Sequence, residues 1–135
     1  MKVEVHRAAS GILYWRDDRF WQLDITVDHE TTGPDAAAYG AAIRSMSAGV
    51  KYPLLIYRAP GSLPSFEALT QFAKVAPELL SAVAYWVVSR QAARTSKLVR
   101  EVFLGGLPVE VFSTEAAAVA WIEAELAQST ARGGW

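Results

Sequence analysis

Two uninterrupted apolar segments, at residues 54–57 and 82–88, restrict the fold of this chain more than any other feature. Neither shows the alternation of polar and apolar residues that marks a strand with one face in water. A continuous apolar run of this length is typical of a strand that is buried on both faces, as in a parallel sheet covered by helices. Segments with apolar residues at helical spacing follow each of them. Strands that alternate with helices in this way predict an α/β layer with parallel strand pairs.

The same patterns along the whole chain predict a single domain at residues 1–127 and a flexible, small-residue tail at residues 128–135. The expected order is strand, strand, strand, helix, strand, helix, strand, helix, strand, helix. Because three strands precede the first helix, the sheet is expected to be mixed. The expected strands cover residues 3–7, 12–16, 20–27, 54–57, 82–88 and 109–112, and the expected helices cover residues 34–48, 66–80, 90–104 and 114–127.

Serine residues are expected to begin three of these helices. Ser65, Ser89 and Ser113 each stand directly before a helical segment, where a serine hydroxyl can accept a hydrogen bond from an N–H group of the first turn. Pro77 lies inside the second helical segment and should end or kink that helix near Ala76.

The segments at residues 12–16 and 20–27 are expected to form a β-hairpin around Asp17 and Asp18. A two-residue loop at these aspartates would pair Tyr14 with Trp21. One face of the hairpin would then belong to the core, and the other would carry Leu13, Trp15, Phe20 and Gln22. The residues expected on the core face are Ile12, Tyr14, Trp21, Leu23, Ile25 and Val27.

The second face of this hairpin has two interpretations. If no helix covers it, Leu13, Trp15 and Phe20 form an apolar patch, which marks a homodimer or protein-partner contact. If helices cover both faces of the sheet, the same residues form a second core layer.

The order of elements, the length and the segment LLIYRAPGSLPSFEAL at residues 54–69 resemble the STAS-domain superfamily, the fold of bacterial anti-sigma-factor antagonists. In that family a short Asp-Ser-Ser-Gly-Leu-type segment opens the helix after the loop. Ser65 stands where the family has its phosphorylatable serine, whereas Pro64, Phe66 and Glu67 depart from the acidic, small-residue pattern around it. The resemblance implies a bacterial, non-catalytic regulatory or protein-interaction module. Because the residues around Ser65 depart from the family pattern, we expect Ser65 to act as a helix cap.

A small anionic ligand is the alternative partner. Ligands of open α/β sheets bind at the carboxyl ends of the strands, and helix N-termini there attract anions. Two serine-capped helices begin near such ends, with an arginine beside each. The candidate ligand-binding residues are Arg58, Ser62, Ser65, Ser89 and Arg90, and ordinary helix capping is the competing explanation for the serines.

Composition and missing motifs exclude several other classes. With 13 basic and 14 acidic residues the net charge is −1, so neither nucleic acid nor an anionic membrane surface is an expected partner. The chain lacks cysteine, a membrane-length apolar run, a secretory signal, and the glycine motifs of serine hydrolases, dinucleotide-binding folds and P-loops. Asp28, His29 and Glu30 are neighbours in an extended segment, so their side chains alternate between faces. We therefore expect a cytoplasmic protein that is not an enzyme and has no metal or cofactor.

Overall fold

The computed structural model describes residues 1–26, 30–60, 62, 64–102 and 106–133. Within this part of the chain, six strands form one mixed sheet in the order β1-β2-β3-β4-β5-β6. The pairs β1–β2 and β2–β3 are antiparallel, and the pairs from β3 to β6 are parallel. The strands are β1 (Lys2–Ala8), β2 (Gly11–Arg16), β3 (Phe20–Ile25), β4 (Tyr52–Arg58), β5 (Leu80–Val87) and β6 (Val109–Phe112), and the helices are α1 (Gly33–Ser47), α2 (Phe66–Leu79), α3 (Arg90–Val102) and α4 (Glu115–Gly133). The predicted fold class, α/β with a mixed sheet, and the predicted order of elements are confirmed.

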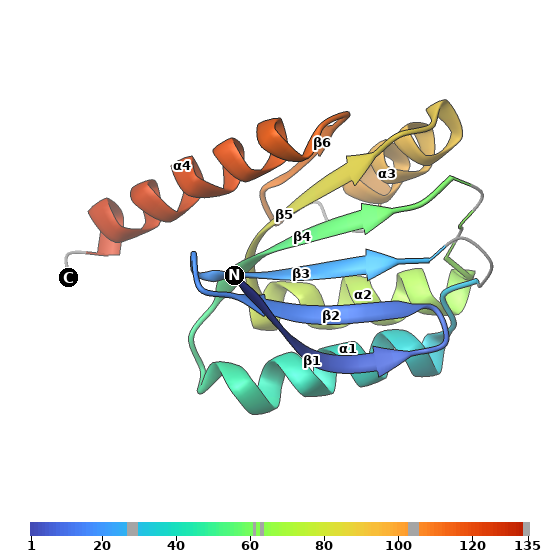
Figure 1. The fold of residues 1–135 in the computed structure, drawn as a ribbon, viewed down its shortest axis with the longest axis horizontal. Helices are drawn as coiled ribbons and strands as arrows, with labels where there is room; N and C mark the ends of the chain where they lie inside the picture. Colours follow the sequence, from blue (N-terminus) through green and yellow to red (C-terminus); the bar gives the residue numbers. More distant parts are fainter. Residues whose placement is uncertain (27–29, 61, 63, 103–105, 134–135) are drawn as a thin grey trace.

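Helices cover the two faces of the sheet unequally (Figure 1). The main core lies between the sheet and α1, α2 and α3, and it includes Trp21 and Ile56, whose side chains are 1% and 3% exposed. A smaller core lies on the opposite face, where Ala118 and Ile122 of α4 pack against Phe20, Leu55 and Ala84. The two apolar strands β4 and β5 are therefore covered from both sides, as their sequences predict.

The register of the β2–β3 hairpin differs from the prediction by one residue. The loop has three residues, Asp17 to Arg19, and pairs Arg16 with Phe20 and Trp15 with Trp21. Arg19 has a φ of 76°, the left-handed conformation that closes a three-residue hairpin loop. Because side chains alternate along a strand, a shift of one residue moves every side chain of β2 to the other face.

This shift removes the predicted contact surface of Leu13, Trp15 and Phe20. Leu13 lies in the main core and Phe20 in the smaller core, and both are 0% exposed. Trp15 is half-buried against the main core and makes edge-on ring contacts with Trp21 at 4.7 Å and Tyr52 at 5.0 Å between centroids. These three residues lie on opposite faces of the sheet, so the placement predicted for them is wrong.

The predicted serine caps are found with one correction. Ser65 and Ser89 are confirmed as caps, since their Oγ atoms accept hydrogen bonds from the N–H groups of Ala68 and Ala92. The cap of α4 is Thr114 rather than Ser113, because the Thr114 Oγ1 accepts from the N–H of Ala117 at 3.2 Å.

Helix α4 ends later than predicted, whereas α2 ends one residue before its predicted end at residue 80. Helix α2 continues past Pro77 to Leu79, because a proline in the last turn removes a single hydrogen bond. Helix α4 continues to Gly133, through most of the segment predicted as a tail, because neither glycine nor proline interrupts it before that residue.

Candidate ligand-binding site

A cavity of about 60 Å³ lies between the sheet and helices α1 and α2. Apolar side chains line most of it. It reaches the carboxyl ends of β3 and β4, where Thr31, Arg58 and Pro64 contribute to the wall. The apolar part of the wall includes Leu23, Ile25, Ile56, Leu69, Phe72 and Leu79.

Arg58 is the charged residue of this wall. Strand alternation places it on the same face of β4 as Leu54 and Ile56, so its side chain enters the space beneath the helices. The residue is 7% exposed, and its Nη1 donates a hydrogen bond to the Ser62 Oγ at 3.3 Å. Within the described part of the chain, no carboxylate forms an ion pair with it. A buried arginine without a carboxylate is unusual, because removing a charge from water is costly unless an opposite charge replaces the water.

Burial also shifts the acid–base equilibria at this end of the cavity. It lowers the pKa of Arg58 below its ordinary value, with the nearby Tyr85 side chain acting in the opposite direction. It raises the pKa of Tyr85 from 10.0 to about 12, against the attraction of the Arg58 charge. Around neutral pH the site therefore holds one guanidinium cation beside a neutral phenol.

A further polar group of the cavity lacks a partner in the structure. The Thr31 Oγ1 is buried and makes no hydrogen bond among the described residues. The main chain of Thr31 is held in place, since its carbonyl accepts a hydrogen bond from the N–H of Ser65 at 2.9 Å. Thr31 therefore combines a fixed backbone in the cavity wall with a buried hydroxyl that has no partner among the described residues.

We expect the free energy of unfolding to fall between pH 10 and pH 12 because of Tyr85. In that range the unfolded chain has lost the phenol proton and the folded chain keeps it, so the stability is full below pH 10 and declines as the pH rises. The loss should approach about 2–3 kcal/mol at pH 12, at about 1.4 kcal/mol per pH unit. Urea unfolding of wild type and Tyr85→Phe at several pH values measures it. If the stability of the two proteins fell in parallel with pH, the loss could not be assigned to Tyr85.

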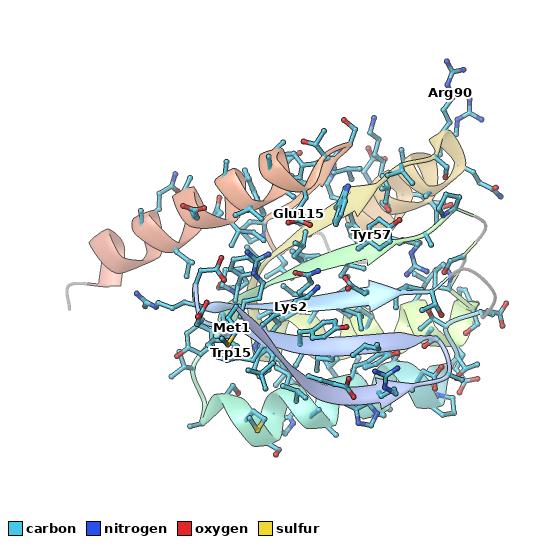
Figure 2. The ribbon with its side chains drawn as sticks, in the orientation of Figure 1. Met1, Lys2, Trp15, Tyr57, Arg90 and Glu115 are labelled. Atoms are coloured by element: carbon cyan, nitrogen blue, oxygen red, sulfur yellow. The ribbon has the colours of Figure 1, made fainter. Side chains whose placement is uncertain are left out.

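The structure divides the predicted site between two places. Arg58 and Ser62 meet at the cavity. Ser65 caps α2 and does not line the cavity. Ser89 and Arg90 belong instead to an open groove at the carboxyl ends of β5 and β6. Arg90 is exposed and projects from the start of α3 away from the sheet (Figure 2).

Sequence reasoning missed Thr31 and Tyr85. Tyr85 stands in the apolar run of β5, where it was indistinguishable from a core aromatic residue. Thr31 follows a strand in a segment that the sequence marks only as a break. Strand alternation offers a signal for the site itself, although not for these two residues, because it places Arg58 on the same face as Leu54 and Ile56.

Among the described residues, no cluster of three or more His, Asp or Glu side chains could hold a metal ion. Asp28 and His29 lie outside the described residues. No described helix has the length and apolar character needed to cross a lipid bilayer.

The comparisons with known proteins establish the fold. No protein-family model and no curated protein matches the chain. A solved structure from Shewanella loihica PV-4, an uncharacterized protein of the DUF3478 family described as having a SpoIIAA-like fold, is similar with a TM-score of 0.54. The match covers 90% of this chain and 92% of that one, at 14% sequence identity. The chain therefore has the SpoIIAA-like α/β fold, which is the fold of the STAS domains that its sequence pattern resembles.

Proposed function

We propose that this protein binds a short-chain monocarboxylate in the cavity beneath α1 and α2, with Arg58 as the counter-ion of the carboxylate. One observation carries the proposal: Arg58 is buried in an apolar cavity and pairs with no carboxylate in the described part of the chain. A ligand carboxylate would supply the missing charge, and the Thr31 hydroxyl could donate a hydrogen bond to the same group.

The charge and size of the cavity support a small monoanion. Arg58 supplies one positive charge, so a phosphate dianion would leave a negative charge uncompensated among apolar side chains. The volume of about 60 Å³ is smaller than the roughly 150 Å³ of an apolar cavity that holds benzene. A short alkyl body, such as that of butyrate, fits this space better than an aromatic ring.

The lining also supports binding rather than catalysis. The described residues of the wall include neither histidine nor an acidic residue that could act as a general base. Arg58, Thr31 and Tyr85 can orient a carboxylate but are not arranged as a nucleophile with a base.

Titration calorimetry with acetate, butyrate, hexanoate and benzoate tests this function, with butyramide and inorganic phosphate as matched probes. Butyrate should bind with the highest affinity, and butyramide and phosphate should bind much more weakly. Arg58→Met should weaken butyrate binding by about 10- to 100-fold, because a hydrogen bond to a charged group contributes about 1.5–3 kcal/mol. Arg90→Met, which removes an exposed arginine outside the cavity, should leave the affinity unchanged.

The stability of the ligand-free proteins provides a second readout. Arg58→Met should unfold at a higher urea concentration than wild type, because it removes a buried charge that has no ionic partner among the described residues. Arg58→Lys keeps the charge but loses the planar fork, and it should retain weak butyrate binding. Equal butyrate affinity in wild type and Arg58→Met, or no saturable binding to any of the carboxylates, would contradict the proposal.

The regulatory or protein-interaction role implied by the fold resemblance loses its expected surface, since Leu13 and Phe20 are buried. The open groove between β5, β6 and α3 gives that role a different basis.

A further inference from the structure

An open groove of about 480 Å³ lies at the carboxyl ends of β5 and β6, beside the first turns of α3. Its lining includes the apolar residues Val88, which is 52% exposed, and Phe112, which is half-buried and packs on Trp121 of α4. Its rim carries Arg90 and Lys97 from α3. The groove is separate from the cavity at Arg58, and the described residues that line the two do not overlap.

The two cations at the rim have no acidic partners in the described part of the chain. Both side chains are exposed, and neither takes part in an ion pair there. Arg100, further along the same helix, is different because it pairs with Glu110 at 3.3 Å and with Glu101 at 3.7 Å. Among the described residues, the groove therefore combines two uncompensated cations with apolar side chains in its lining.

The spacing of these cations favours an extended partner over a single small anion. Arg90 and Lys97 are seven residues apart on one helix, which corresponds to about 10 Å along its axis. Three residues of extended or polyproline-type chain span about the same distance. A single phosphate could contact one of the two cations but would not reach both. The Ala92 N–H at the α3 N-terminus is not free to bind it either, because this N–H already donates a hydrogen bond to the Ser89 Oγ.

From these features we infer that the groove binds an acidic, extended peptide segment of a partner protein. The peptide takes the polyproline-type conformation, which repeats every three residues, so two carboxylates three residues apart point to the same side and pair with Arg90 and Lys97. An apolar side chain between them contacts Val88 and Phe112. The peptide occupies the strand ends rather than extending the sheet, because the Arg100–Glu110 ion pair crosses from α3 to the edge strand β6.

Selection of a random heptapeptide display library against the purified protein tests this inference. The enriched sequences should carry two acidic residues three positions apart with an apolar residue between them. A fluorescein-labelled synthetic copy of the enriched peptide should bind in a salt-dependent manner. The double variant Arg90→Glu/Lys97→Glu should weaken this binding by at least about tenfold, since reversing both charges replaces attraction with repulsion.

Lys74→Glu is the charge-reversal control, because Lys74 is exposed on α2 and does not line the groove. It should change the affinity by less than about twofold. Circular dichroism checks that all variants are folded, and Arg90→Gln/Lys97→Gln provides a second, milder double variant. Failure to enrich any acidic pattern would overturn the inference, as would an equal loss in Lys74→Glu or displacement of the peptide by millimolar inorganic phosphate.

Discussion

Trp21→Ala should lower the free energy of unfolding by about 3–5 kcal/mol, because it removes a large side chain from a packed interior. Trp21 is 1% exposed on β3, between β2 and β4, and its ring meets the ring of Trp15 edge-on. An alanine would leave a cavity that the neighbouring strands cannot close, since both are fixed by ladder hydrogen bonds. Urea unfolding followed by circular dichroism measures the change.

Trp21→Phe separates the loss of volume from the loss of the indole N–H. The Trp21 Nε1 is buried and has no hydrogen-bond partner among the described residues, so its removal leaves no acceptor unsatisfied. Trp21→Phe should therefore lose much less stability than Trp21→Ala. A loss below about 1 kcal/mol for Trp21→Ala would show that this side chain is not part of the core.

Gly11→Ala should destabilise the protein by about 3 kcal/mol or more, through a clash of main-chain atoms. Gly11 begins β2 and pairs with Ile25 in β3. A Cβ at this position would overlap the carbonyl oxygen of Asp24, and it would lie 3.1 Å from the Ile25 Cα. Because the obstructing atoms belong to the backbone of a neighbouring strand, no rotamer change relieves the contact.

Gly106→Ala is the control for the intrinsic effect of replacing glycine. A Cβ at Gly106 meets nothing within 4 Å, so this substitution should change stability by no more than about 0.5 kcal/mol. Thermal unfolding of both variants beside wild type gives the comparison. Similar melting temperatures for Gly11→Ala and wild type would mean that β2 and β3 are further apart than the structure places them.

The order of elements followed from the sequence because it depends on local patterns. The apolar runs of β4 and β5, the helical spacing between them and the caps at Ser65 and Ser89 each depend on residues close together in the chain. The face of β2 was predicted wrongly because it depends on the length of one loop. Asp17 and Asp18 are compatible with a two-residue loop, and the left-handed conformation of Arg19 makes it a three-residue loop.

Only part of the candidate site could be predicted from the sequence, and the reason is related. The sequence places Arg58 and Ser62 four residues apart, so their meeting is a local event. The separation of Ser89 and Arg90 from Arg58 depends on the lateral positions of β4, β5 and β6 and on the helices that cover them. Thr31 reaches the cavity because its segment bridges to Pro64, a contact between distant parts of the chain.

The sequence by itself determined the α/β class and the succession of strands and helices. Each of these is set by hydrophobic periodicity, which is a property of neighbouring residues. Tertiary structure alone decided that Arg58 lies on a buried face of β4 with no carboxylate partner among the described residues, and that α4 is the described helix that covers the second face of the sheet. Burial depends on which helix packs over which strand, and that packing is fixed by long-range contacts that no local pattern contains.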